Sequence, residues 1–410
     1  MKTHLLQAYQ SKSSALSEHQ VFRIVLSAAV QHNVPVAFWR KPNGTEKEGI
    51  VGFCNQLPYK QVDLEEMGSG FVLGAFESKE RQAYVIPADL YFKSNNFEFS
   101  NFGNGRSTSS DLKTAFGQTL DQMLSDGIPE SALQSEFHVS TDTPSHLSQS
   151  HFEQIVSQGI QGIKDGLFKK VVLSRTKEAT LPANYDVVEN FFTLCEAYPA
   201  AFVSMVSVPG LGTWVGASPE TLISVDENQV FRTVALAGTQ AKGNQTTAEA
   251  RWAQKEIEEQ ALVGRYIINC FKKIRLREYD EQGPRTVAAA HLLHLCSTFA
   301  VDMQSANFPQ LGTVMLELLH PTSAVCGMPK EETLAFILAN EGYDRALYSG
   351  FIGPVNIEQR TDLFVNLRCM QALKGKAVLY AGAGITEDSE PINEWKETEL
   401  KMETMLKHIQ

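Results

Sequence analysis

Short runs of apolar and β-branched residues, several of them alternating with polar residues, predict strands along much of the chain. In the first third, VAFWR and EGIVGF are predicted strands that follow a helix with apolar spacing over residues 19–34. Later, the helical pattern HFEQIVSQGIQGIKDGLF leads into KKVVLSRTKEATL, whose β-branched content indicates a strand. Both kinds of element therefore recur along the sequence.

The middle and the end of the chain continue this pattern. AFVSMVSV and TWVGAS read as a hairpin because Pro-Gly-Leu-Gly lies between them, and TLISV and VFRTVALAGT are the next strands. A long helix is predicted from about residue 246 to residue 274. The sequence ends with the strands LFVNLRCMQAL and AVLYAGAGI and a C-terminal helix.

One polar segment divides the chain. HVSTDTPSHLSQS, residues 138–150, is rich in Ser, Thr and Pro, a composition typical of a connector. We therefore predict an N-terminal part over residues 1–140 and a larger domain over residues 150–410. No internal repeat is present.

Composition narrows the class of protein. The 410 residues are 43% hydrophobic and 20% charged, which is globular usage and excludes collagen-like and disordered chains. A net charge of −11 without a long basic run argues against binding to nucleic acid. The sequence contains no stretch of about 18 apolar residues, the length that would suggest a membrane span. The six cysteines are widely spaced, so we expect buried thiols and a cytoplasmic protein rather than a disulfide framework.

The long helix carries two carboxylates on its apolar side. At about 100° per residue, Glu256 and Glu259 fall on the stripe formed by Trp252, Val263, Tyr266, Cys270 and Ile274. An ionised carboxylate on a core-facing stripe needs a cation or hydrogen bonds. Surface glutamates at a frayed helix end are the alternative, and the pattern alone does not decide.

The C-terminal helix repeats this theme. Ser389 is a candidate N-cap, and Pro391 suits the first turn. Glu394, Glu397 and Lys401 follow on one face, and two carboxylates one turn apart suit a hard divalent ion such as Mg²⁺. The simpler alternative is a solvated face on which Glu397 pairs with Lys401.

Other residues are weaker candidates by themselves. In KVVLSR, alternation sets Lys170 on one face of the strand beside an aliphatic side chain, where a desolvated amine suits a base. An exposed lysine at a sheet edge is the common alternative. Glu220 in GASPE follows a strand and a proline, and the glycines at 382 and 384 in AGAGI allow a close approach to a bound anion or form a simple bend.

Taken together, these motifs resemble a known family. KVVLSR, GASPE, ALAGT, EEQALV, HPTSAVCGMPK, LFVNLR, AGAGI and EPINEWKETELK occur in the order found in the chorismate-utilising enzymes, over about residues 150 to 408. The resemblance implies an α+β fold in which large antiparallel sheets pack face to face with helices outside. It also implies that the first 140 residues are a variable part that completes this fold and that residues 150–410 form the chorismate-binding catalytic domain.

The resemblance assigns roles to the candidates. In this family the KVVLSR lysine is the base that activates water and the GASPE carboxyl is the general acid, which implies these roles for Lys170 and Glu220. Mg²⁺ is the implied cofactor, and the matching ligands are Glu259, Glu394 and Glu397. The histidine that usually follows the first metal glutamate is glutamine here, so the motif does not choose between positions 258 and 259, but helix geometry favours Glu259.

The substrate side follows in the same way. The family binds the enolpyruvyl carboxylate through residues that match Tyr348, Arg368, Gly382 and Lys401. The ring carboxylate is expected near the metal and near Gly238 and Thr239, and His294 matches a histidine close to the reacting ring. Basic side chains and a backbone donor are suitable partners for an anion.

Two features discriminate among the family's activities. Anthranilate synthases carry glutamine where Lys170 stands, and aminodeoxychorismate synthases carry lysine where Ala237 stands. Water is therefore the expected nucleophile, which implies an isochorismate synthase, an isomerase of chorismate, without a glutaminase subunit. A salicylate synthase, which goes on to eliminate pyruvate, is the main alternative, and the segment from Ser323 to Gly327 favours the synthase of isochorismate. A monomer is the default state, and the sequence leaves open whether the product would enter menaquinone, siderophore or salicylate synthesis.

Overall fold

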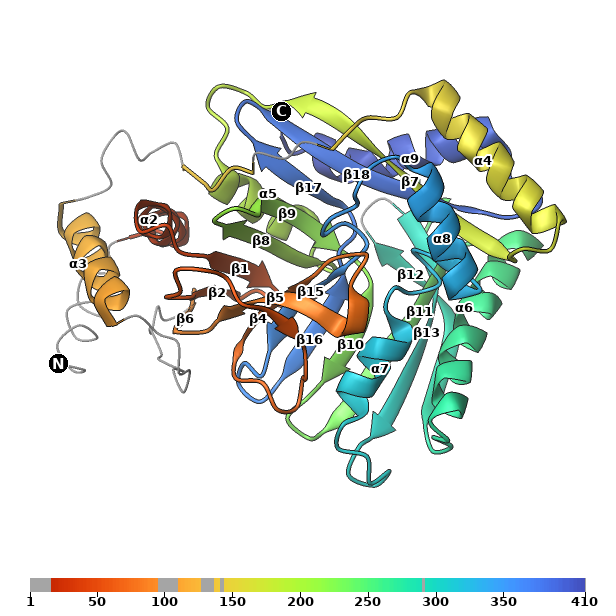
Figure 1. Cartoon of the computed structure of the whole chain (residues 1–410), viewed down its shortest axis with the longest axis horizontal. Helices are drawn as coiled ribbons and strands as arrows, with labels where there is room; N and C mark the ends of the chain where they lie inside the picture. The colour runs from red at the N-terminus through yellow and green to blue at the C-terminus, as the bar shows by residue number, and fades with distance from the viewer. Residues whose placement is uncertain (1–15, 95–109, 127–135, 141–143, 290–291, 410) are drawn as a thin grey trace.

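The computed structural model describes residues 16–94, 110–126, 136–140, 144–289 and 292–409. Over these residues the chain forms two nine-stranded sheets with helices around them (Figure 1). Sheet A has the strand order β14-β7-β18-β17-β9-β8-β1-β2-β6, and sheet B has the order β12-β13-β11-β10-β16-β15-β4-β5-β3. All neighbouring strands are antiparallel.

The strands of sheet A are β1 (Val36–Arg40), β2 (Lys47–Val51), β6 (Leu90–Lys93), β7 (Lys170–Thr180), β8 (Phe202–Val208), β9 (Gly212–Ser218), β14 (Gly327–Met328), β17 (Cys369–Leu373) and β18 (Lys376–Ile385). Those of sheet B are β3 (Tyr59–Gln61), β4 (Gly70–Gly74), β5 (Gln82–Pro87), β10 (Thr221–Val225), β11 (Val230–Ala241), β12 (Asp280–Ala289), β13 (Leu292–Asp302), β15 (Phe351–Val355) and β16 (Thr361–Val365).

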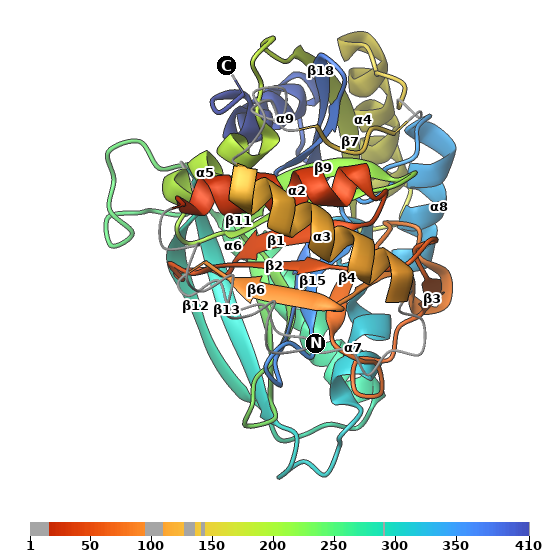
Figure 2. The same ribbon diagram turned by 90° about the vertical axis from the view of Figure 1, so that its left-hand side faces the viewer.

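The helices are α2 (Glu18–Gln31), α3 (Ser110–Asp126), α4 (Gln149–Lys164), α5 (Val187–Ala197), α6 (Gln254–Lys273), α7 (Leu311–Leu319), α8 (Lys330–Asn340) and α9 (Pro391–Leu406), with a 3-10 turn η2 at Lys79–Arg81. Helices α4 and α9 pack on β7 and β18, while α6 packs on β11 and β13. Figure 2 shows α2 and α3 in front of β1 and β2.

The two sheets pack face to face, as the sequence predicts. Phe202 of sheet A stacks on Phe364 of sheet B, with ring centroids 4.0 Å apart. Strand β1 shows why its sequence is apolar throughout: Val36 and Phe38 join the core under the helices, whereas Ala37 and Trp39 join the core between the sheets. Because side chains alternate along a strand and both faces are buried, the run carries almost no polar residue.

The N-terminal segment contributes strands to both sheets. Strands β1, β2 and β6 extend sheet A, and β3, β4 and β5 extend sheet B. The predicted connector ends at α4, whose N-cap Ser148 accepts a hydrogen bond from the backbone of His151. The division into parts 1–140 and 150–410 stays a prediction.

The chain passes from one sheet to the other in two segments that lie close together. Residues 219–220 lead from β9 in sheet A to β10 in sheet B, and residues 366–368 lead from β16 in sheet B to β17 in sheet A. The two crossings are joined by Ser218, whose hydroxyl donates to the carbonyl of Val365 at 2.8 Å. Glu220 and Arg368 therefore lie on the crossings, where backbone leaves the regular ladders and side chains converge.

The long helix is shorter than predicted. It begins at Gln254 rather than near residue 246, because Thr246 and Glu249 form a local turn in which the Glu249 carboxylate accepts from the Thr246 backbone. Trp252 therefore precedes the helix instead of joining its stripe, and its indole donates to Thr286 at 2.9 Å. Ile274 is the C-cap.

All six cysteines are buried free thiols, as predicted. Among the helices that the structure describes, none has the length and apolar character needed to cross a membrane.

Candidate active site

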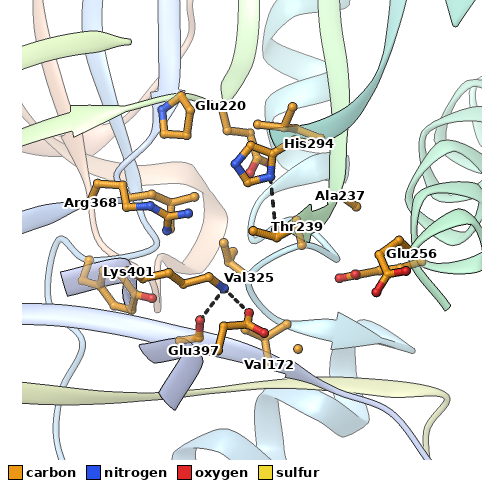
Figure 3. A pocket seen from close by; sticks show the side chains of 18 of the residues that line it. Val172, Glu220, Ala237, Thr239, Glu256, His294, Val325, Arg368, Glu397 and Lys401 are labelled. Carbon is orange, nitrogen blue, oxygen red and sulfur yellow. Dashed lines mark hydrogen bonds and ion pairs between the residues drawn. The ribbon is translucent and has the colours of Figure 1, made fainter. Parts of the chain in front are cut away.

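A pocket opens between the ends of β11, β13 and β18, the crossing segments and the first turns of α6 (Figure 3). Most of the predicted site residues line it: Glu220, Thr239, Glu259, His294, Tyr348, Arg368, Gly382, Glu397 and Lys401. Lys170, Gly238 and Glu394 lie beside it. The residues come from segments far apart in the sequence, so only the fold brings them together.

Lys170 is buried, which excludes the exposed edge lysine. Its side chain is 2% exposed, and its Nζ donates to Glu259 Oε1 at 2.7 Å. Strand β7 pairs along one edge with β18, and Gly384 of β18 lies next to the lysine. A Cβ at Gly384 would lie 2.9 Å from Lys170 Cε and 3.4 Å from Glu259 Oε1. The second glycine of AGAGI therefore makes room for this ion pair at the pocket wall.

Glu220 is a second buried titratable group. It is 4% exposed, and burial raises the pKa of its carboxyl to about 7, although the charges of Lys170 and Arg368 and the hydroxyl of Thr322 lower it in part. A carboxyl with this pKa is protonated in a large fraction of molecules near neutral pH. This is the property that a general acid needs.

Arg368 and Lys401 give the pocket a cationic side. In Figure 3 both side chains point into the pocket from one side, across from Glu256. Lys401 Nζ donates to the carbonyl of Gly382 at 2.8 Å and pairs with Glu397 at 2.6 Å. Within the described part of the chain, nothing accepts a hydrogen bond from the Arg368 guanidinium. Its backbone φ is 47°, an uncommon value for a residue with a side chain, which local structure must enforce.

Thr239 and His294, with Gly238 beside them, form one wall of the pocket. The Thr239 hydroxyl lies 3.1 Å from Nδ1 of His294, opposite it in the β11–β13 ladder. The register shifts at Gly238, whose φ of 71° favours glycine, and a Cβ at this position would lie 3.1 Å from the backbone oxygen of Glu256. Burial, helped by the charges of Arg368 and Lys401, lowers the pKa of His294 to about 3, so this ring is neutral. Tyr348 is also buried, which raises its pKa to about 12.

Carboxylates gather at the starts of α6 and α9. Burial and then the negative charge of Glu397 raise the pKa of Glu394. For Glu259, burial opposes ionisation, but the charge and hydrogen bond of Lys170 outweigh it and lower the pKa. Glu256 lines the same pocket. Their carboxylate oxygens are the hard donors that Mg²⁺ prefers.

Three of these carboxylates each have a lysine as their ion-pair partner. Lys170 holds Glu259, Lys401 holds Glu397, and Lys255 lies 3.9 Å from Glu394. Among the described residues, no three acidic, histidine or cysteine side chains are already grouped as a metal site. The predicted pair Glu397–Lys401 is thus present, but it lines a pocket and is not merely a solvated surface pair.

The environment of Gln260 shows why the helical phase identifies the pocket glutamate, Glu259 rather than Glu258, better than the family motif does. Gln260 is buried: its Oε1 accepts from the backbone of Ala237 at 3.0 Å, and its Nε2 donates to the carbonyl of Ala235 at 3.1 Å. Glu259 then faces the pocket, whereas Glu258 is exposed and accepts from Gln254. The side chain of Gln260 fastens α6 to β11.

One prediction about α9 is wrong. Ser389 is not the N-cap: the helix begins at Pro391 after Glu390, without a side-chain cap. The Ser389 hydroxyl instead accepts from the backbone of Thr386 at 3.1 Å. The turn before the helix uses the serine, so Pro391 at the first position, as predicted, is the main start signal.

Several lining residues were not predicted as site residues. Lys255 and Glu256 extend the charged side, and Ala324 and Val325 form an apolar wall. The stripe on α6 already pointed to Glu256. Nothing local marks Lys255, since an exposed lysine in the first turn of a helix is ordinary.

Comparison with known proteins adds family information. A family model described as chorismate binding enzyme matches residues 85–410. The isochorismate synthase EntC of Escherichia coli is 29% identical over 268 residues, which cover 63% of this chain and 66% of that protein. The salicylate biosynthesis isochorismate synthase of Pseudomonas aeruginosa is 32% identical over 263 residues, covering 62% of this chain and 53% of its own length. The matched regions thus cover less than two thirds of the length of each of these two relatives.

Solved structures support the fold. The menaquinone-specific isochorismate synthase MenF of Escherichia coli has a TM-score of 0.71 at 20% identity, covering 94% of this chain and 91% of that one. Anthranilate synthase component I of Streptococcus pneumoniae has a TM-score of 0.66 at 19% identity, with coverages of 91% and 92%. Because structures with different titled activities match, the fold alone does not choose the product.

Proposed function

The chain belongs to the chorismate-binding enzyme family, and on this premise we propose that it is an isochorismate synthase that converts chorismate to isochorismate with Mg²⁺. The observation that carries the proposal is a pocket lined by Glu220 and by Arg368, whose guanidinium has no hydrogen-bond partner among the described residues, with the buried Lys170 next to it. The guanidinium suits a carboxylate substrate, and the other two groups suit a base and an acid.

In the proposed chemistry one water molecule enters at C2 and one leaves from C4, so the atoms balance. Lys170 takes a proton from a water molecule that forms a bond to C2 of the ring, the double bonds shift, and the C4–O bond breaks. Glu220 gives its proton to the departing C4 hydroxyl, which leaves as water. The reaction is an isomerisation, so the reverse direction uses the same two groups with their roles exchanged.

Binding is proposed to use the cationic side of the pocket. Arg368, Lys401, Tyr348 and the backbone at Gly382 would hold the enolpyruvyl carboxylate, in keeping with the unpaired guanidinium. The ring carboxylate would lie near Thr239. Two anchored carboxylates fix the ring between base and acid, and such orientation supplies much of the rate enhancement.

Mg²⁺ would be held by Glu259, Glu394 and Glu397, where it would supply positive charge that neutralises and orients the ring carboxylate. Glu256 and Lys255 border this site. Burial and then the negative charge of Glu397 raise the pKa of Glu394, and a bound cation would offset both effects.

The choice of water over ammonia rests on two positions. Lys170 stands where anthranilate synthases have glutamine. Ala237, which lines the pocket, stands where aminodeoxychorismate synthases have a nucleophilic lysine. Neither amidation nor a covalent lysine adduct is therefore proposed.

Product analysis tests the proposal. Purified protein is incubated with chorismate and Mg²⁺, with and without ammonium, and products are identified by NMR. Isochorismate as the main product in both conditions is expected. Salicylate with pyruvate would point to the salicylate synthase, anthranilate or an amino intermediate to an amidating enzyme, and unchanged chorismate to a binding protein. Each of these three outcomes would overturn the proposal.

A further inference from the structure

Outside the pocket, the most fully buried ion pair lies between Glu341 and Arg345, whose side chains are each 2% exposed. Arg345 Nε donates to Glu341 Oε2 at 2.7 Å, and its guanidinium lies over the ring of Phe76, 4.1 Å from the centroid. Burying two charges is expensive, and apolar residues in their place are often as stable. The proposed reaction does not use either residue directly, so the pair needs another explanation.

The partners of the pair are backbone groups of β7 and of the pocket wall. Arg345 Nη2 donates to the carbonyl of Val172 at 2.8 Å, and Nη1 donates to the carbonyl of Val325 at 2.9 Å. Glu341 accepts from the backbone of Ser174 at 2.6 Å and from its hydroxyl at 2.9 Å. Val172 and Val325 both line the pocket.

The strand needs these partners because its neighbour is too short. On the side away from β18, β14 pairs with β7 only at Lys170 and Val171. Beyond this point, no strand in the described part of the chain bonds the carbonyl of Val172 or the N–H of Ser174, although both residues are buried. Unpaired buried backbone groups are costly. The side chains of Glu341 and Arg345 therefore stand in for the missing strand, two to four residues from Lys170.

Arg345 also takes part, through its backbone carbonyl, in the turn that leads to Tyr348. The backbone N–H of Tyr348 donates to the carbonyl of Arg345 at 2.9 Å. The hydroxyl of Tyr343 lies 2.6 Å from that of Ser174. One ion pair thus connects the strand of the proposed base, the apolar pocket wall and a substrate-side tyrosine.

We propose that Glu341 and Arg345 are positioning residues, which hold the β7 segment that carries Lys170 in register with the pocket wall at Val325 and with Tyr348. This inference rests on the proposed function for its kinetic consequence, but not for its structural one. A small displacement of a reacting group lowers the rate strongly, of the order of a hundredfold for about 1 Å. The pair therefore acts on turnover through Lys170 without touching the substrate.

The test uses Arg345→Lys, which keeps the positive charge but loses the planar fork. Its matched control is Arg40→Lys. Arg40 is as fully buried and also donates to backbone carbonyls, among them those of Tyr198 at 2.6 Å and Ala201 at 2.9 Å, but it is not one of the residues that line the pocket. Both variants are compared with the wild type by urea unfolding, by kcat and KM for chorismate, and by amide hydrogen exchange of peptides covering residues 170–176.

We expect both variants to lose stability, whereas only Arg345→Lys should lower kcat, by at least about tenfold, and accelerate exchange at residues 170–176. Ser174→Ala, which removes one hydroxyl from the network, should show a smaller loss of the same kind. Equal kcat and equal exchange in Arg345→Lys and the wild type would overturn the inference, as would the same kcat loss in Arg40→Lys. If the wild type does not convert chorismate, the proposed function fails, and the exchange comparison alone decides the positioning role.

Discussion

Replacing Glu220 by glutamine is expected to remove a loss of stability that the wild type shows as the pH rises, and to remove activity as well. The carboxyl is 4% exposed, and its pKa in the folded state is about 7, against a reference value of 4.5. Between these two values the folded chain holds a proton that the unfolded chain has released. Stability of the wild type must therefore fall as pH rises through this window.

The size of the effect follows from the shift. A difference of about 2.5 pKa units corresponds to about 3 kcal/mol at pH values well above 7, at about 1.4 kcal/mol per unit. Part of the loss is already present at pH 5, so the change between about pH 5 and about pH 8.5 is roughly 2 to 3 kcal/mol. Glutamine has no proton to lose, and Glu220→Gln should lack this part of the pH dependence.

The assay is urea unfolding of the wild type and of Glu220→Gln in a chelating buffer without substrate, at both pH values. The quantity of interest is the change with pH in the stability difference between the two proteins, because the direct cost of the substitution cancels. Glu258→Gln is the control, since that carboxylate is exposed on the same helix as Glu259. A stability difference between wild type and Glu220→Gln that stays constant from pH 5 to pH 8.5 would refute the reasoning.

Four further predictions concern the pocket. Glu397→Gln should weaken Mg²⁺ binding in calorimetry and abolish turnover while the protein stays folded, whereas the control Glu258→Gln should bind Mg²⁺ as the wild type does. EDTA should inactivate the wild type reversibly, and full activity in excess chelator would contradict the metal assignment. Lys170→Met should lower kcat by at least about a hundredfold. Because it removes the ammonium group bound to Glu259, it should also tighten Mg²⁺ binding, and unchanged or weaker binding would show that the Lys170 ammonium and Mg²⁺ do not compete for Glu259. Arg368→Gln should raise KM for chorismate by about tenfold or more, the scale of a charge-assisted hydrogen bond, and an unchanged KM would remove Arg368 from the carboxylate site. Saturating ammonium should leave isochorismate as the product, and an amino product would revive the amidating alternative.

Periodicity was sufficient to locate individual side chains on their elements. The helical phase distinguished Glu259 from Glu258, and the structure puts the former in the pocket and leaves the latter exposed. Alternation in KVVLSR likewise separated Lys170 from its neighbours on the strand. These inferences depend on a single element, so a local pattern carries them.

Relations between distant segments were beyond such patterns. The ion pair between Lys170 and Glu259 joins residues 89 positions apart, and it depends on Gly384 of a third segment. The crossing of the chain between the sheets at Glu220 is equally invisible, because the strands on either side look alike in sequence. Glu341 and Arg345 have the spacing of an ordinary helical surface pair, and only the short β14 explains their burial.

The chorismate-binding family frame supplied what local patterns lacked, by relating the separate motifs to one another. It was least informative where this chain departs from the family. At Gln260 the structure gives a physical reason for the side chain, the two hydrogen bonds to β11. The prediction of Ser389 as the N-cap came from the local pattern rather than from the family, and it was wrong because serine is also a common turn residue.

The central claim is that water, activated at Lys170, attacks C2 while the C4 hydroxyl departs with the proton of Glu220. Conversion of chorismate in oxygen-18 water tests it most directly. Isochorismate is isolated early in the reaction, and the position of the label is found by mass spectrometry and NMR. The account predicts one oxygen-18 atom on C2 in the wild type and loss of labelled product in Lys170→Met. Isochorismate that carries no solvent oxygen, or labelled product formed at the wild-type rate by Lys170→Met, would contradict it.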